Sequence, residues 1–192
     1  MPTVAITGAA GAIGSVTAEV FSDAGWDLAL LDYGSDNHAT LNASFPDAQV
    51  FDADLTDADA AQDAFDAIES AGALDAVLAI AGGFAMQSAV EATADDYAHM
   101  MDLNVRTLFN TARAAVPVLT EQEHSFLLGV SAPAGTTQAE ETATSAASSL
   151  VGTNTGDNIF GLVTGVASSV SEIFKAAFAL PDLLGAIGIP AA

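Results

Sequence analysis

The chain has 192 residues, a length that suits one domain with a sizeable buried core. Its 25 acidic and three basic residues give a formal net charge of -22, which would repel nucleic acid and anionic membrane surfaces. Because 51% of the residues are apolar, this acidity is not the composition of a disordered chain. We therefore expect a folded protein with an acidic surface and with neither a nucleic-acid nor a membrane partner.

The composition also suggests a cellular setting. Few basic residues beside many Asp and Glu are typical of halophilic proteins, because concentrated salt screens the repulsion between like charges. The chain leads from Met1 and Pro2 directly into an apolar segment without a basic leader, so we expect a cytoplasmic protein in a salt-rich cell. Since there is no cysteine, neither a disulfide framework nor a thiolate metal site is expected.

A short apolar run over residues 3–7 predicts a buried strand, and a glycine-rich turn follows it. Glycine permits a tight turn and the close approach of a ligand to the backbone, and the start of the next helix offers unpaired N–H groups at its positive end. This arrangement predicts a site for the pyrophosphate of a dinucleotide. The residues expected to form it are Gly8, Gly11, Ala12, Ile13 and Gly14.

The second strand is predicted over residues 26–31, after a helix that stops at Gly25, and it ends in Asp32. Asp32 stands 18 residues beyond Gly14, near the offset of about 20 residues at which an acid binds the adenosine ribose of a dinucleotide. Its carboxylate can accept hydrogen bonds from both ribose hydroxyls but would repel a 2′-phosphate, and no arginine is nearby in the sequence. We therefore expect NAD rather than NADP.

Residues 33–47 read as a loop with one helical turn over 39–45, in which His38 is solvated. A third strand is predicted over 48–53, followed by Asp54 and Leu55. Thr56 is expected to cap the next helix, which ends at Gly72.

The fourth strand is predicted over residues 74–80 and leads into Ala81, Gly82 and Gly83, where small residues would let the backbone lie against a ligand. Thr93 and Asp96 form a capping box that starts a long helix, expected to run to Pro117.

The apolar stripe of that helix predicts that Tyr97 and Met101 lie in the core, with Asn104 as a buried amide that serves either structure or a site. His99 is expected to be exposed, and His124 lies in a polar connection without metal-ligand spacing, so we expect no metal.

A fifth strand over residues 125–131 completes an alternation of strands and helices. This order predicts a Rossmann-like, doubly wound parallel sheet in a three-layer α/β domain. In such sheets the ligand crevice lies at the carboxyl ends of the strands. The residues that fall there are Gly8, Asp32, Asp54, Gly82 and Ser131.

Residues 1–131 resemble the short-chain dehydrogenase/reductase family. The segment from Thr7 to Gly14 is similar to its cofactor motif, although the spacing TGxxGxxG is that of the extended and atypical branches. The resemblance implies that Asp54 and Leu55 contact the adenine and that Asn104 supports a proton-relay water. It implies further that Ala81, Gly82 and Gly83 correspond to the end of the family's Asn-Asn-Ala-Gly motif, with Ala79 and Ile80 in place of both asparagines.

The chain departs from the family where the chemistry should lie. Ser131 or its neighbour Ala132 takes the position of the family's serine, but no tyrosine follows Tyr97 and the only lysine is Lys175. The family's Tyr-x-x-x-Lys pair, which supplies the acid/base group, is therefore absent from the sequence. Since general acid catalysis typically contributes about 100- to 10,000-fold, the loss should be severe.

We expect one domain, with a dinucleotide-binding core over residues 1–132 and an atypical C-terminal segment over 133–192. That segment reads as a mobile loop followed by apolar helices, packed on the sheet or on a second subunit in a homo-oligomer. The leading hypothesis is an NAD-dependent oxidoreductase acting on a small carbonyl or alcohol. The alternatives are a non-catalytic NAD-binding module, such as a sensor or interaction protein, and a truncated or artificial family-like chain.

Overall fold

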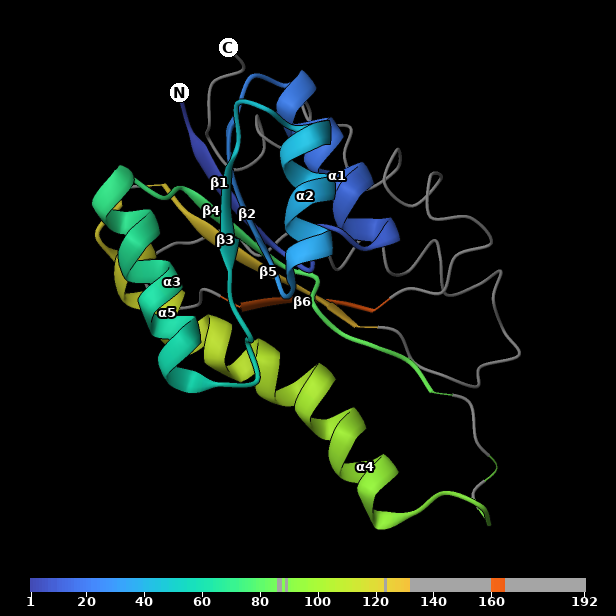
Figure 1. Ribbon diagram of the computed structural model, residues 1–192. Helices are drawn as coiled ribbons and strands as arrows, with labels where there is room; N and C mark the ends of the chain where they lie inside the picture. Colours follow the sequence, from blue (N-terminus) through green and yellow to red (C-terminus); the bar gives the residue numbers. More distant parts are fainter. Residues whose placement is uncertain (86–87, 89, 123, 132–159, 165–192) are drawn as a thin grey trace.

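The computed structural model describes residues 1–85, 88, 90–122, 124–131 and 160–164. Its centre is a parallel sheet of six strands in the order β3-β2-β1-β4-β5-β6 (Figure 1). The strands are β1 (Thr3–Thr7), β2 (Asp27–Asp32), β3 (Gln49–Asp52), β4 (Ala76–Ala79), β5 (Phe126–Ser131) and β6 (Phe160–Thr164). The order reverses between β1 and β4, so the predicted doubly wound sheet is confirmed.

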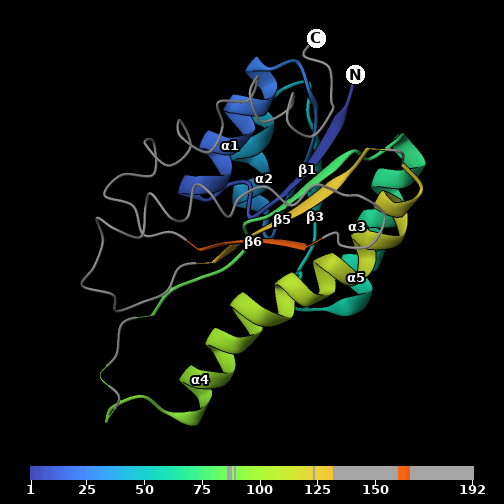
Figure 2. The same cartoon turned by 180° about the vertical axis from the view of Figure 1, so that it is seen from behind.

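Helices cover both faces of this sheet. α1 (Ala12–Asp23) and α2 (Ser35–Ser44) lie on one face, and α3 (Ala58–Ala71) and α5 (Thr107–Thr120) lie on the other (Figures 1 and 2). The result is the expected three-layer arrangement.

The side chains of β1 show how the sheet serves both layers. Val4 and Ile6 pack into the cluster beneath α1 and α2, whereas Ala5 between them joins the cluster beneath α3 and α5. All three are fully buried, because successive side chains of a strand point to opposite faces and both faces are covered by helices.

The carboxyl ends of the central strands lie at one edge of the sheet. Thr7 at the end of β1 is in register with Leu31 of β2 and with Ala79 of β4. Asp32, the last residue of β2, is in register with Asp52 of β3. The loops that follow these strands therefore meet at a common edge.

The segment after β2 differs from the sequence expectation. Residues 35–44 form α2, a full helix where the sequence predicted a loop with one turn. Gly34 has a φ of 100°, which lets the chain turn sharply out of β2 into the helix, and Leu41 is buried against the sheet. Tertiary burial of Leu41 stabilises a segment whose polar composition suggested a loop.

Helix α4 (Ala94–Met101) starts at the predicted capping box and continues through a π-helical turn, η1 (Asp102–Arg106), into α5. Helix α5 passes Pro117 and ends at Thr120, so the predicted stop at Pro117 is wrong. The core position predicted for Tyr97 and Met101 is also wrong, because they are 68% and 39% exposed. Helix α4 projects beyond the sheet and has no buried residues (Figure 1).

Most of the predicted C-terminal segment lies outside the described residues. Its one described part, Phe160–Thr164, is the strand β6 parallel to β5, in a tract for which the sequence suggested a helix. Phenylalanine, leucine, valine and threonine suit a β-strand as well as the apolar face of a helix, so the sequence pattern of this tract is compatible with either element. In the described part of the chain, no helix has the length and apolar character needed to cross a membrane.

Candidate functional site

The glycine-rich turn between β1 and α1 is tightly packed. Gly8 has a φ of 66°, and a Cβ at this position would lie 2.9 Å from the Cα of Ala81. A Cβ at Gly14 would lie only 2.1 Å from the carbonyl oxygen of Gly8. The two glycines therefore bring the start of α1 against the end of β1, and the turn against the segment after β4.

The start of α1 is open toward this turn. Gly11 stands at the N-cap without a side-chain hydrogen bond, and the first turn of α1 contains no acid. The first N–H groups of a helix have no partner inside the helix and lie at its positive end. This end of α1 can bind an anion.

Asp32 links three segments of the site. Its Oδ2 accepts a hydrogen bond from the amide of Ala10 at 2.8 Å. Its Oδ1 accepts one from the amide of Tyr33 at 2.8 Å and one from Nδ2 of Asn37 at 2.7 Å. The carboxylate thus ties the glycine-rich turn to the end of β2 and to α2.

Thr7 holds the ends of β1 and β4 together. Its fully buried hydroxyl oxygen accepts hydrogen bonds from the amides of Ile80 and Ala81, both at 3.0 Å. Thr107 approaches the same segment from α5, with its hydroxyl 3.4 Å from the carbonyl oxygen of Ala81. The segment after β4 is therefore held from both sides.

The loop after β3 is held by two side chains. Oδ1 of Asp54 accepts hydrogen bonds from the amide and the hydroxyl of Thr56, at 2.9 and 2.6 Å. The predicted helix cap at Thr56 is wrong, because Asp57 caps α3 instead. From α5, Nδ2 of Asn110 donates to the carbonyl oxygens of Leu55 and Thr56, at 2.9 and 3.3 Å.

These segments surround a cavity of about 530 Å³ at the carboxyl edge of the sheet. Every residue predicted to bind the cofactor lines it, except Gly83, which is not among its lining residues. The lining residues are Gly8, Ala10, Gly11, Ala12, Ile13, Gly14, Asp32, Tyr33, Asn37, Ala53, Asp54, Leu55, Thr56, Ile80, Ala81, Gly82, Leu103 and Thr107.

Of the two predicted catalytic residues, Asn104 is not among the described residues that line this cavity. Asn104 lies in η1 and is exposed rather than buried; its Oδ1 accepts from the amide of Gly83 at 3.1 Å, and its Nδ2 donates to the carbonyl oxygen of Gly83 at 3.0 Å. This reciprocal pair fixes Gly83 to η1. Ser131 is the last residue of β5, beside β6.

The sequence analysis missed three polar residues at this edge. Asn37 falls in the segment predicted as a loop, Asn110 is the buried amide of the long helix in place of Asn104, and the hydroxyl of Thr7 bridges two strands. For Asn110, the signal in the sequence is its place among small apolar residues that continue the buried face of α5.

The histidines give no metal site in the described residues. His99 is exposed as predicted, and no group of three or more His, Cys, Asp or Glu residues there could hold a metal ion. His38 was predicted to be solvated in a loop, but it lies on α2, half-buried, with Nε2 3.3 Å from the carbonyl oxygen of Asp32 and 3.7 Å from Oδ1 of Asp52.

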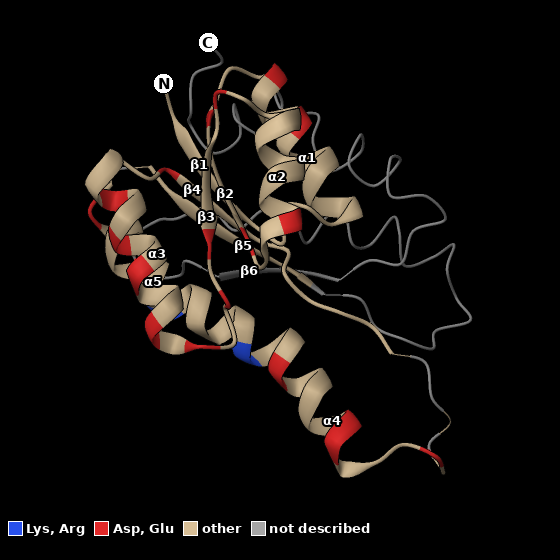
Figure 3. Cartoon of the chain, viewed as in Figure 1, with Lys and Arg blue, Asp and Glu red and all other residues tan. Residues whose placement is uncertain are grey.

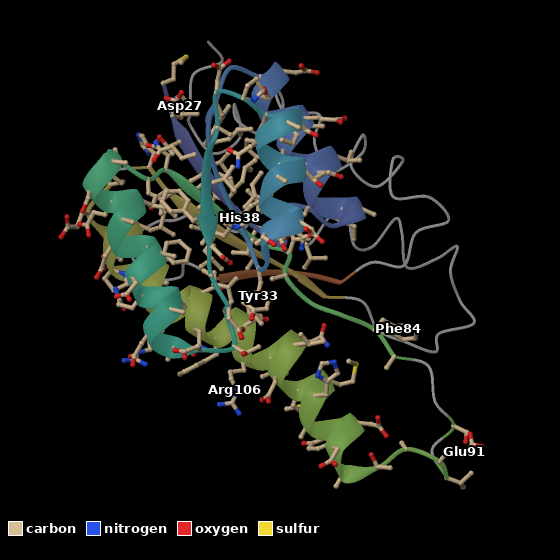
Figure 4. All side chains as sticks on the ribbon, in the orientation of Figure 1. Asp27, Tyr33, His38, Phe84, Glu91 and Arg106 are labelled. Carbon is tan, nitrogen blue, oxygen red and sulfur yellow. The ribbon has the colours of Figure 1, made fainter. Side chains whose placement is uncertain are left out.

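Acidic residues far outnumber lysine and arginine along the described chain (Figure 3). The two described basic side chains are Arg106 and Arg113, on η1 and α5, and Arg106 pairs with Asp102 at 2.7 Å. Figure 4 shows Tyr33 and His38 where α2 meets the sheet, whereas Arg106 points away from the sheet. Among the described residues that line the cavity there is neither an arginine nor a lysine.

Comparison with known proteins identifies the family. The family model for short chain dehydrogenases matches residues 2–151. An uncharacterized oxidoreductase of Mycobacterium tuberculosis, Rv1714, is 37% identical over 126 residues, which cover 62% of this chain and 46% of that protein. This chain thus spans about half the length of the curated relatives it matches.

Solved structures agree. A short-chain dehydrogenase/reductase of Brucella melitensis, described as a glucose/ribitol dehydrogenase, is 28% identical with a TM-score of 0.64, over 69% of this chain and 57% of the other. The NADPH-dependent 3-quinuclidinone reductase of Rhodotorula rubra is 25% identical with a TM-score of 0.61, over 68% and 52%. The resemblance inferred from the sequence is confirmed, and the chain belongs to the short-chain dehydrogenase family.

Proposed function

We propose that this chain binds NAD in the cavity at the carboxyl edge of the sheet. By family it is an oxidoreductase acting on a small carbonyl or alcohol, in which the usual acid/base pair is missing from the sequence. The observation that carries the proposal is the pairing, around one cavity, of an uncapped helix start with the carboxylate of Asp32.

The residues present fit a dinucleotide. The cavity volume of about 530 Å³ lies within the range of about 300–1,000 Å³ that is common for small-molecule sites. The start of α1 offers N–H groups to a diphosphate, and Gly8 and Gly14 leave no side chain between the helix and the turn. Leu55 and Tyr33 add an apolar and an aromatic surface for a base at the end of the cavity near Asp32.

The preference for NAD over NADP rests on charge. The family fold does not decide it, because the Rhodotorula rubra reductase depends on NADPH. In this chain Asp32 lines the cavity, and the lining residues within the described part of the chain include neither an arginine nor a lysine. A 2′-phosphate would bring up to two negative charges beside this carboxylate without a cation to balance them.

A bound nicotinamide would supply a hydride to a carbonyl substrate. The protein would have to supply a proton to the carbonyl oxygen, and the chain offers little for that step. No tyrosine follows Tyr97, and Tyr97 is 68% exposed on α4, which projects beyond the sheet. The histidine nearest to Ser131 in the sequence, His124, precedes the opposite end of β5, and no lysine or tyrosine stands near Ser131 in the sequence to tune its hydroxyl.

The missing proton donor favours a second function, a non-catalytic NAD-binding module that acts as a sensor or an interaction protein. It would keep the groups around the cavity and lack turnover. The two functions differ in one measurement, the oxidation of NADH in the presence of carbonyl substrates.

Binding itself can be tested by calorimetry with NADH and NADPH at about 2 M KCl, where repulsion between the acidic groups is screened. We expect NADH to bind more tightly than NADPH, and Asp32→Ala to narrow the difference. Tighter binding of NADPH by the unaltered chain would contradict the preference, and no binding of either nucleotide would contradict the proposed function.

A further inference from the structure

The orientation of the Asn37 side chain is set by its neighbours. Its Nδ2 lies 2.7 Å from Oδ1 of Asp32 and 3.0 Å from the carbonyl oxygen of Tyr33. Both neighbours only accept hydrogen bonds, so the nitrogen of the amide and not its oxygen must face them. The two protons of Nδ2 are thereby used within the protein.

The carboxylate of Asp32 is largely occupied as well. Its oxygens accept three hydrogen bonds from the protein, two at Oδ1 and one at Oδ2. A carboxylate has about four acceptor positions, so the position left belongs to Oδ2. Asp32 can therefore accept one ribose hydroxyl, not the two that the sequence suggested, unless a protein donor is displaced.

Asn37 supplies the second hydrogen-bond acceptor that Asp32 lacks. It is exposed and lines the cavity beside Asp32, and its Oδ1 has no hydrogen-bond donor among the described residues. Because both amide protons are bound, Asn37 offers the cavity an acceptor and no donor. This end of the cavity thus offers two acceptors, Oδ2 of Asp32 and Oδ1 of Asn37.

We propose that Asn37 is a second specificity-determining residue, which accepts the 2′ hydroxyl of an unphosphorylated adenosine ribose while Asp32 accepts the 3′ hydroxyl, the one that NADPH also has. The inference rests on the proposed binding of NAD. A ribose with free 2′ and 3′ hydroxyls brings two donors to the two acceptors. A 2′-phosphate brings oxygens that accept and carry negative charge, so it gains nothing from Asn37.

The charged groups around Asn37 also favour NAD over NADP. Two further acids lie near this site: Asp36 is in the first turn of α2, and Oδ1 of Asp52 accepts a hydrogen bond from the amide of Gly34 at 3.2 Å. The described basic group that contacts this segment is His38, but its Nε2 faces the Asp32 carbonyl oxygen and the Asp52 carboxylate. A 2′-phosphate lacks the hydroxyl donor, and no described cation is placed to bind it instead.

The test compares Asn37→Ala with Asn42→Ala. Asn42 is a matched control, because it is also exposed on α2 and its Nδ2 donates to a carbonyl oxygen four residues earlier, that of His38 at 2.8 Å, but it does not line the cavity. By calorimetry at high salt, Asn37→Ala should weaken NADH binding about 3- to 10-fold, the usual effect of one hydrogen bond, and should not weaken NADPH binding. Asn42→Ala should leave both affinities unchanged.

A second measurement separates direct contact from support of Asp32. Analogues of NADH that lack the 2′ or the 3′ hydroxyl of the adenosine ribose should each bind the unaltered chain more weakly. In Asn37→Ala, the penalty for removing the 2′ hydroxyl should disappear, while the penalty for removing the 3′ hydroxyl remains. A role limited to holding Asp32 would reduce both penalties together.

The inference is overturned if Asn37→Ala leaves the ratio of NADH to NADPH affinity unchanged, or if both deoxy penalties persist in it. In either case the unaltered chain still binds NADH, so the proposed function stands. If the unaltered chain binds neither NADH nor NADPH, the proposed function and this inference fail together. Circular dichroism of both variants checks that each is folded.

Discussion

The two ends of the sheet's carboxyl edge are built differently. At the end near Asp32, two backbone amides and the side chain of Asn37 donate to one carboxylate, and buried Asn110 holds the neighbouring loop. At the other end, the segment after β4 carries Gly82 and Gly83, both exposed, and its contact with η1 is the exposed side chain of Asn104. Thr7 and Thr107 hold Ile80 and Ala81, but beyond Ala81 the described hydrogen bonds of this segment are made by one exposed side chain, whereas the end near Asp32, the proposed binding end, is held by groups from several segments.

This difference matches what the family's chemistry would require of each end. Binding a nucleotide needs groups that are already in place, and the described residues near Asp32 provide them. Hydride transfer needs in addition a positioned proton donor, and the chain has no tyrosine beyond Tyr97 to serve as one. A protein that keeps the first set and lacks the second would bind NAD with little turnover.

The largest expected effect is the dependence of folding on salt. It tests whether the end near Asp32 can form when the repulsion between its acidic groups is not screened. Asp32 and Asp52 end β2 and β3 in register, Asp54 follows β3 and lines the same cavity as Asp32, and the whole chain carries a formal charge of -22. The Debye length falls from about 10 Å at 0.1 M to about 3 Å at 1 M salt, so screening should weaken this repulsion strongly. We expect the chain at low salt to lose much of the roughly 5–15 kcal/mol by which domains are stable.

Thermal unfolding followed from about 0.1 to 2 M KCl at neutral pH measures this dependence. The melting temperature should rise steeply with salt. A flat melting temperature would refute the halophilic interpretation and would mean that the acids after β2 and β3 tolerate one another without screening.

The second effect concerns the far end. NADH oxidation with a panel of ketones and aldehydes should be about 100- to 10,000-fold slower than general acid catalysis would allow. Stopped assays at high salt, with binding measured in parallel, check this. Robust turnover that is abolished by Ser131→Ala or Tyr97→Phe would show that the far end does contain the acid and would remove the contrast between the two ends.

The third effect concerns the glycine-rich turn that both ends share. Gly14→Ala would place a Cβ 2.1 Å from the carbonyl oxygen of Gly8, so α1 must move away from β1. We expect a loss of about 3 kcal/mol in the free energy of unfolding, together with loss of NADH binding. Chemical denaturation and calorimetry measure the two effects.

Gly72→Ala is the control for that substitution. Gly72 follows α3 in an extended conformation, and an added Cβ would meet nothing within 4 Å. Its effect should stay within about 0.5 kcal/mol. Equal effects of the two substitutions would show that the packing of Gly14 is not special.

The fourth effect tests the link between the two ends. Thr7→Val keeps the shape of a fully buried side chain but removes the oxygen that accepts hydrogen bonds from the amides of Ile80 and Ala81. Leaving partly buried amides without a partner should lower the free energy of unfolding by about 2 kcal/mol. Thr120→Val, at an exposed hydroxyl near the end of α5, is the control and should change little. An equal loss in both would contradict the role of Thr7.

The smallest effect compares one amide from each end. Asn110→Ala removes the donor to the carbonyl oxygens of Leu55 and Thr56 in a buried setting, and we expect a loss of about 2 kcal/mol. Asn104→Ala removes the pair with Gly83 in an exposed setting, where water can replace it, and should lower the free energy of unfolding by about 0.5 kcal/mol. Denaturation curves of both variants measure the difference. A larger loss for Asn104 would reverse the comparison.

Much of the binding end could be predicted from the sequence because its signals are local. The glycines at positions 8, 11 and 14 follow a buried strand directly, and Asp32 ends the next strand, so strand periodicity alone placed them at one edge. The capping box at Thr93 was likewise predicted, since its two residues are three apart.

Local signals failed where burial by distant segments decided the structure. Residues 35–44 are polar and read as a loop, but Leu41 packs against the sheet and the segment is helical. Tyr97 and Met101 show the opposite error: their helical spacing suggested a core face, but the described part of the sheet does not extend beneath α4, so the same spacing leaves them exposed.

The sequence by itself therefore determined the class of fold, the family and most of the residues that line the cavity at the carboxyl edge. Only the tertiary structure decided how the polar groups pair. The hydroxyl oxygen of Thr7 accepts a hydrogen bond from the amide of Ile80, 73 residues away, and Asn110 donates one to the carbonyl oxygen of Leu55, 55 residues away. Hydrogen bonds between distant segments leave no period in the sequence, because each needs only one polar residue at a place that the packing of the helices on the sheet creates.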